Sequence, residues 1–162
     1  EVPEVGGDTL FSSMYLAYEA LSDGLKSTLK NLKAWHSSRH AFGYGVVDSE
    51  SYHDWHLANP DKATQDALHP VVITHPLTGR KALYVNKDFT VRLDGWTVEE
   101  SRPLLEYLYE HGARQEFTCR FHWQPGSVAF WDNRATWHYA MNDYHGHRRI
   151  MHRITLEGVA LS

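Results

Sequence analysis

The sequence has few of the features that mark secreted or membrane proteins. Its 162 residues contain a single cysteine, Cys119. One cysteine excludes an intramolecular disulfide and is typical of a reducing compartment, so we expect a cytoplasmic protein. No apolar run reaches the roughly 18 residues that a membrane span needs, so we expect no membrane partner. The first residues, EVPEVGGD, have no basic segment followed by an apolar one, and we expect no signal peptide.

Several classes of binding and catalytic motif are also missing. The formal net charge is -4 and no long basic run is present, which argues against a nucleic-acid partner. The chain has no glycine-rich phosphate loop, no Cys-x-x-Cys, no His-Glu-x-x-His and no Gly-x-Ser-x-Gly. Its length, its 42% hydrophobic content and the absence of internal repeats predict a single globular domain over 1–162.

The first part of the chain alternates between strand-like and helical patterns. A β-rich run at 8–11 predicts a strand, and apolar residues at helical spacing over 13–32 predict a helix in two pieces. Residues 33–36 predict a short strand. The polar stretch 37–68 is long for a connection inside a compact domain, so we expect either an active-site lid or a disordered surface loop there.

The central part contains signals for both hairpins and helices. Two β-rich runs at 71–74 and 81–85 flank a Pro/Gly turn, which predicts a β-hairpin. A capping box at 97–100 predicts a helix that runs to about residue 111. Alternating apolar residues over 117–123 predict a further strand. Short strands between two clusters of helices predict a mainly β domain, with a β-sandwich or jelly-roll core and helices outside.

The segment 130–155 contains the side chains best suited to bind a ligand. His138 precedes Arg149 and Arg153, and a strand over 149–155 would place both arginines on one face. Two neighbouring cations need anionic partners, and imidazole is a common ligand of divalent iron, zinc and copper. The pattern therefore indicates a metal site that binds acidic small molecules. Two other interpretations stay open, in which His138 is structural and the arginines lie on a solvated edge strand.

The motifs in this segment resemble those of a known family. WDNRATWH at 131–138 and DYHGHRRIMHR at 143–153 resemble the C-terminal signature of the taurine dioxygenase-like (TauD/TfdA) family of Fe(II)- and 2-oxoglutarate-dependent dioxygenases. EVPEVGGDTLF, HPVVITHPLTGRKALYVN and RIMHRIT match the same family in the same order. The resemblance covers nearly the whole chain and implies a double-stranded β-helix, which is a jelly-roll variant.

The resemblance also implies roles for individual residues. His138 matches the distant histidine of the family's iron triad, whose other ligands come from a His-x-Asp pair. Arg149 matches the arginine that pairs with the distal carboxylate of 2-oxoglutarate, and Thr9 matches the threonine that assists it. Arg153 matches the arginine that meets the anionic group of the substrate in taurine-type members.

Three aromatic residues match the substrate pocket. Phe89 and Phe42 match its apolar walls, and Trp131 matches a position close to the iron. The resemblance further implies a small anionic substrate and O2 as partners, and a homo-oligomer, either a dimer or a tetramer. The segment 37–68 is the candidate lid of this active site.

One part of the family pattern is missing. None of the 12 histidines lies in a His-x-Asp or His-x-Glu pair. In the family that pair precedes the segment matched here, so we expect this chain to be the C-terminal portion of a longer catalytic domain. One imidazole cannot hold Fe(II) tightly, and we expect the polypeptide alone to be inactive, with exposed sheet edges.

The resemblance implies an enzyme that hydroxylates a sulfonate or an alkyl sulfate, with Fe(II) as cofactor, 2-oxoglutarate as cosubstrate, and succinate and CO2 as coproducts. Three alternatives remain. The chain could be a catalytically inactive jelly-roll module that binds an organic anion, or an aryloxyalkanoate dioxygenase. It could also belong to a different metal enzyme on a cupin-like barrel, with further ligands converging on His138.

Overall fold

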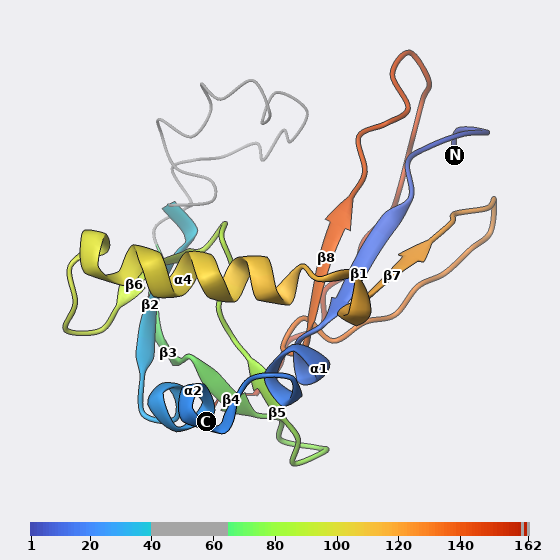
Figure 1. The fold of residues 1–162 in the computed structure, drawn as a ribbon. Helices are drawn as coiled ribbons and strands as arrows, with labels where there is room; N and C mark the ends of the chain where they lie inside the picture. Colours follow the sequence, from blue (N-terminus) through green and yellow to red (C-terminus); the bar gives the residue numbers. More distant parts are fainter. Residues whose placement is uncertain (40–64, 160, 162) are drawn as a thin grey trace.

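The computed structural model describes residues 1–39, 65–159 and 161, and these form a mainly β structure with helices on its outside (Figure 1). The first sheet is antiparallel and has the order β7-β1-β8. Its strands are β1 (Thr9–Ser13), β7 (Thr118–Phe121) and β8 (Thr136–Ala140). The strand predicted at 8–11 is confirmed, and the strand predicted at 117–123 is shorter than expected.

The other strands form a second sheet and a hairpin. The second sheet has the order β3-β2-β6, and β4 pairs with β5. The hairpin predicted around the Pro/Gly turn is confirmed, as is the short strand at 33–36. The elements are β2 (Lys33–Ser37), β3 (Asp66–Pro70), β4 (Val72–Thr74), β5 (Lys81–Leu83) and β6 (Thr90–Leu93).

The predicted helices begin where their capping residues lie. Ser13 and Ser22 accept hydrogen bonds from backbone N–H groups in the first turns of α1 and α2. Thr97 and Glu100 form the complete capping box. The helical elements are α1 (Met14–Glu19), α2 (Asp23–Leu29), α4 (Val98–Gly112) and a 3-10 turn, η2 (Gln115–Phe117). None of the helices in the described ranges is long and apolar enough to cross a membrane.

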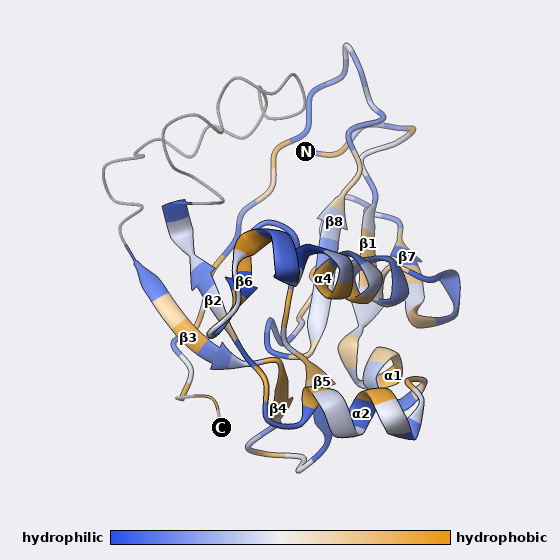
Figure 2. Ribbon diagram, turned by 60° about the vertical axis from the view of Figure 1, so that its left-hand side comes forward, coloured by the Kyte–Doolittle hydropathy of each residue, from blue (hydrophilic) through white to orange (hydrophobic). Residues whose placement is uncertain are grey.

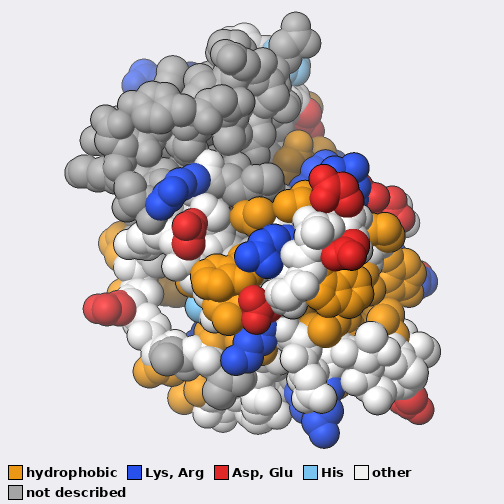
Figure 3. Space-filling view, turned by 90° about the vertical axis from the view of Figure 1, so that its left-hand side faces the viewer, with side chains coloured by type: hydrophobic (Ala, Val, Ile, Leu, Met, Phe, Trp, Pro, Cys, Tyr) orange, Lys and Arg blue, Asp and Glu red, His pale blue; other side chains and the backbone are white. Residues whose placement is uncertain are grey.

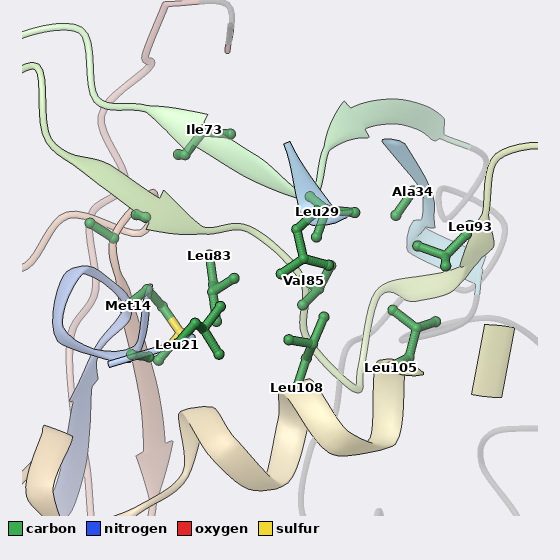
Figure 4. Close-up of a cluster of buried hydrophobic side chains, with 14 residues drawn as sticks. Met14, Leu21, Leu29, Ala34, Ile73, Leu83, Val85, Leu93, Leu105 and Leu108 are labelled. Carbon is green, nitrogen blue, oxygen red and sulfur yellow. The ribbon is translucent and has the colours of Figure 1, made fainter. Parts of the chain in front are cut away.

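The hydrophobic core lies between these helices and the β4–β5 hairpin (Figure 4). Leu29, Ile73 and Leu108 each have 0% of their surface exposed. Figure 2 shows that the apolar stretches of β4 and β5 lie beside α1 and α2. On the face in Figure 3, apolar side chains lie among acidic and basic ones. The core is therefore built by local elements that bury the apolar faces predicted from their periodicity.

The predicted strand over 149–155 is wrong. These residues have no regular secondary structure. A strand needs a partner that accepts and donates its backbone hydrogen bonds. Ile150 exchanges two such bonds with Glu1, at 2.9 and 3.1 Å. The described part of the chain offers the rest of this segment no neighbouring strand, so Ile154 remains 89% exposed.

Candidate functional site

The register of the first sheet brings the candidate site residues together. Phe11 lies opposite His138, and Thr9 lies opposite Ala140. Directly opposed residues project to the same face, as do residues two apart along a strand. The four residues therefore share one face of the sheet. The opposite face is covered by α4, where Trp137 packs against Gly112.

His138 is held by aromatic packing. Its ring centroid lies 5.0 Å from that of Trp131, and Trp131 lies 5.2 Å from Phe11. Burial against these rings lowers the pKa of His138, the charge of Arg153 lowers it further, and the charge of Asp88 opposes both. A neutral imidazole keeps the lone pair that a metal ligand needs. Trp131 thus lies beside His138, and its position near an iron stays a prediction.

The residues present do not make an iron site by themselves. No group of three or more His, Cys, Asp or Glu side chains within the described ranges could hold a metal ion. Divalent iron in a facial triad requires two histidines and a carboxylate. His138 could supply one of these donors, and the others would then have to come from outside the described residues.

Arg149 is the best-defined candidate for an anion receptor. It is half-buried, its Nε donates a hydrogen bond to the carbonyl of Gly7 at 2.9 Å, and its guanidinium lies 5.9 Å from the Tyr144 ring centroid. Its two terminal nitrogens make no hydrogen bond to any residue of the described ranges. Such a pair of parallel donors matches the geometry of a carboxylate.

Thr9 lies on β1, two residues before Phe11, and is buried. Its Oγ1 accepts a hydrogen bond from Trp123 Nε1 at 2.9 Å. The hydroxyl hydrogen is then left to donate to a ligand, because a threonine hydroxyl has one donor and two acceptor positions. Thr9 and Arg149 thus present donors at the same end of β1.

The remaining predicted site residues are placed less closely. Arg153 is exposed in the irregular C-terminal segment, near enough to His138 to affect its pKa. Phe89 is half-buried, with its N–H bonded to Asn86 Oδ1 and its carbonyl bonded to Ser37 N, each at 2.8 Å. Phe42 and most of the candidate lid at 37–68 lie outside the described residues.

Sequence reasoning missed a charged group beside Thr9. Asp8 is buried, with 6% of its side chain exposed. It accepts hydrogen bonds from Arg120 Nε and from His122 Nδ1, the latter at 2.8 Å. These bonds, chiefly that from Arg120, hold the pKa of Asp8 below its ordinary value. The position of Asp8 directly before Thr9 was the available signal, but its partners lie more than a hundred residues away.

The polar turn before His138 has a structural explanation. Asp132 forms an ion pair with Arg134 and a hydrogen bond with the buried His75, whose Nε2 lies 2.9 Å from Asp132 Oδ2. The bond from Arg134 is the largest cause of the lowered pKa of Asp132. These contacts tie the turn of the β4–β5 hairpin to the start of β8. The turn therefore holds β8 in place.

Comparisons with known proteins agree with this arrangement. Residues 1–155 match the family described as Taurine catabolism dioxygenase TauD, TfdA family. An alkylsulfatase of Acinetobacter baylyi is 40% identical over 158 residues, which make up 97% of this chain and 50% of that protein. An alpha-ketoglutarate-dependent sulfate ester dioxygenase of Pseudomonas putida is 36% identical over 157 residues, or 96% of this chain and 52% of that protein.

The fold is also similar to solved structures. The crystal structure of a putative alpha-ketoglutarate-dependent taurine dioxygenase from Burkholderia xenovorans superposes with a TM-score of 0.71 and 39% sequence identity. The match covers 88% of this chain and 45% of that chain. The chain thus spans about half the length of the curated relatives it matches.

Proposed function

The chain belongs to the Taurine catabolism dioxygenase TauD, TfdA family, and on that premise we propose that it forms the C-terminal part of the catalytic domain of an Fe(II)- and 2-oxoglutarate-dependent dioxygenase. The complete fold would be a double-stranded β-helix, in which strands from elsewhere in the protein pair with the free edges of the β7-β1-β8 sheet. Its substrate would be a small organic anion, a sulfonate or an alkyl sulfate.

The observation that carries this proposal is the hydrogen bonding of the Arg149 guanidinium. Its Nε is fixed on the Gly7 carbonyl, while its terminal nitrogens are free of hydrogen bonds to the described residues. These nitrogens would hold the distal carboxylate of 2-oxoglutarate through two parallel hydrogen bonds. The hydroxyl of Thr9, already accepting from Trp123, would donate a third. The cosubstrate would thereby be oriented with its other end toward His138.

Arg153 and Phe89 would serve the substrate. The influence of Arg153 on the pKa of His138 supports a position near the site, where its charge would bind a sulfonate or sulfate group. Phe89, and Phe42 from the segment 37–68, would supply apolar walls that exclude water. Trp131 would pack beside the substrate, next to the imidazole that it already contacts.

His138 fits the role of one iron ligand, and the two others are proposed to lie in a His-x-Asp pair outside this sequence. The described residues would bind the cosubstrate and the anion, but one imidazole would not support a chemical step at iron. The same reasoning favours one alternative, an inactive module that binds organic anions, if the complete protein also lacks such a pair.

The decisive experiment measures succinate formation by the full-length protein with Fe(II), 2-oxoglutarate and O2. Sulfonates, sulfate esters, aryloxy acids and neutral analogues would be compared as substrates. We expect succinate with sulfonates or sulfate esters in preference to aryloxy acids. Binding of 2-oxoglutarate without succinate from any substrate would favour the inactive module. Preferential turnover of aryloxy acids would indicate an aryloxyalkanoate dioxygenase instead.

We also propose a cytoplasmic homo-oligomer, either a dimer or a tetramer. The single cysteine, Cys119, is free and exposed, which suits a reducing compartment. Phe130 and Leu156 are 94% and 86% exposed, and a neighbouring subunit would cover such apolar side chains. Light scattering on the full-length protein tests the oligomer, and a monomer at micromolar concentration would contradict it.

A further inference from the structure

Gly7 lies between Asp143 and Arg149, and its backbone forms a hydrogen bond with each of them. Its N–H donates to Asp143 Oδ1 at 2.7 Å, and its carbonyl accepts from Arg149 Nε at 2.9 Å. Gly7 is buried and has a φ of 71°. A Cβ at this position would lie 3.0 Å from Arg149 Cδ and 3.1 Å from Pro3 Cγ. Glycine suits this position because the positive φ strains other residues and a Cβ would crowd the arginine stem.

The preceding glycine allows an equally close approach from the other side. Gly6 has a φ of 81°, and a Cβ there would lie 2.6 Å from the backbone oxygen of Asp143. Real Cβ atoms do not come so close to a carbonyl oxygen. The two glycines thus allow Asp143 and Arg149 to approach the short segment before β1 closely. We call Gly6, Gly7 and Asp143 the glycine cradle.

Asp143 is itself tied to the sheet. Its Oδ2 lies 3.6 Å from Arg120 Nη2, and Arg120 in turn bonds to the buried Asp8. The backbone carbonyl of Asp8 also accepts a hydrogen bond from Met141 N at 2.9 Å. The cradle is therefore linked to the strand end that carries Thr9. The two proposed contacts to the cosubstrate, from Thr9 and Arg149, share one network of hydrogen bonds and ion pairs.

We propose that Asp143 is a positioning residue, which acts through the Gly7 peptide to aim the terminal nitrogens of Arg149 at the distal carboxylate of a 2-oxo dicarboxylic acid. This inference rests on the proposed function. Because Nε is occupied by Gly7, a carboxylate can meet only the two terminal nitrogens. Because the guanidinium is fixed relative to Thr9, the network selects cosubstrates that carry a second carboxylate at the end of the chain.

A purely structural role for Asp143 would have a different consequence. It would lower stability and weaken binding of every 2-oxo acid to a similar extent. A positioning role affects only ligands that reach Arg149. The test therefore compares 2-oxoglutarate with 2-oxopentanoate, which has the same carbon chain but ends in a methyl group instead of the distal carboxylate.

The experiment uses the full-length protein with Mn(II) under oxygen-free conditions and measures Kd by titration calorimetry. We expect Asp143→Ala and Gly7→Ala to weaken 2-oxoglutarate binding by about tenfold, the size of one lost charge-assisted contact. Binding of 2-oxopentanoate should stay within about twofold of wild type. Asp143→Asn keeps an acceptor for the Gly7 N–H and should lose only about threefold.

The matched control is Asp94→Ala. Asp94 accepts a hydrogen bond from Trp35 Nε1 at 2.9 Å and lies outside the cradle. It should leave both Kd values unchanged. Melting temperatures show whether each variant is folded, and Asp143→Asn provides a milder change if Gly7→Ala does not fold.

Two outcomes overturn the inference. Asp143→Ala could bind 2-oxoglutarate as well as wild type, or it could lose affinity for both ligands equally, and either result removes the positioning role. If wild-type protein does not bind 2-oxoglutarate at all, the proposed function itself fails and the inference fails with it. The wild-type titration thus separates the two failures.

Discussion

Two parts of the molecule, one closed and one open, differ in how completely their apolar side chains are buried. The core between α1, α2, α4 and the β4–β5 hairpin buries its large side chains fully, with Leu83 and Leu108 at 1% and 0% exposure. The candidate site lies on the β7-β1-β8 sheet and the irregular segment after it, where Ile154 and Leu156 are 89% and 86% exposed. The first part is closed by its own side chains, while the second is open around the candidate site.

The largest expected effect lies in the closed part. Leu108→Ala removes a fully buried side chain and should lower the free energy of unfolding by about 3 kcal/mol, from lost burial and the cavity that remains. Denaturant unfolding of the full-length protein measures this change. Leu77→Ala, at a site 84% exposed on the hairpin turn, is the control and should change stability by less than about 0.5 kcal/mol. Equal losses for both variants would contradict the placement of Leu108 in a closed core.

A second test concerns a buried histidine at the boundary of the core. His36 is 8% exposed, and its Nε2 has no partner among the described residues. Burial, with a smaller contribution from the charge of His69, lowers the pKa of His36 to about 4. In the unfolded chain the same group takes up a proton near its ordinary pKa of about 6.5, so it binds more protons than the folded state between these values.

Stability should therefore fall as the pH is lowered from about 6.5 to about 4, by an amount on the order of 3 kcal/mol from His36. His36→Gln, which does not titrate, should flatten this dependence in unfolding curves recorded across that range. His147→Gln, at an exposed position, controls for the effect of replacing a histidine by glutamine. An unaltered slope in His36→Gln would show that the imidazole is not neutral in the folded protein.

The third test removes a side chain of the candidate site and leaves the hydrophobic core unchanged. Arg149→Ala in the full-length protein should weaken binding of 2-oxoglutarate by about 100-fold, because a charge-assisted pair of hydrogen bonds is lost. The melting temperature should change little, since the guanidinium bonds only to Gly7 among the described residues. Cosubstrate dependence of succinate formation measures the effect. Unchanged affinity would refute the role of Arg149.

The smallest effect is expected at Arg153. Arg153→Ala should raise the KM for a sulfonate or sulfate ester by about tenfold and leave the KM for 2-oxoglutarate unchanged, because the exposed side chain would contact only the substrate. Steady-state kinetics with each ligand varied in turn separate the two constants. Wild-type turnover of neutral analogues at the same rate would show that no anion receptor operates there.

Sequence patterns predicted the closed part well because its signals are local. Serine and threonine caps, a Pro/Gly turn and helical apolar spacing each act within a few residues, and the structure confirms α1, α2, α4 and the β4–β5 hairpin. The strand over 149–155 was predicted from the same kind of pattern and is wrong. Alternation shows that a segment could pair, but it cannot supply the partner strand.

The candidate site was predicted from the sequence only in part. Resemblance to a family assigned roles to His138, Arg149, Thr9 and Arg153, and those roles remain predictions. The sequence did not indicate that Phe11 lies opposite His138, or that Asp8 meets Arg120 and His122. Those contacts depend on strand register and on pairs more than a hundred residues apart.

By itself, the sequence determined the helices and turns, the family, and the absence of a His-x-Asp or His-x-Glu pair from these 162 residues. Those properties depend on residue identity and short-range spacing. The tertiary structure alone decided how Arg149 is held. Its Nε donates to the Gly7 carbonyl, the Gly7 N–H donates to Asp143, and both Gly6 and Gly7 have a positive φ. Such a contact depends on where distant backbones meet, which local patterns do not encode.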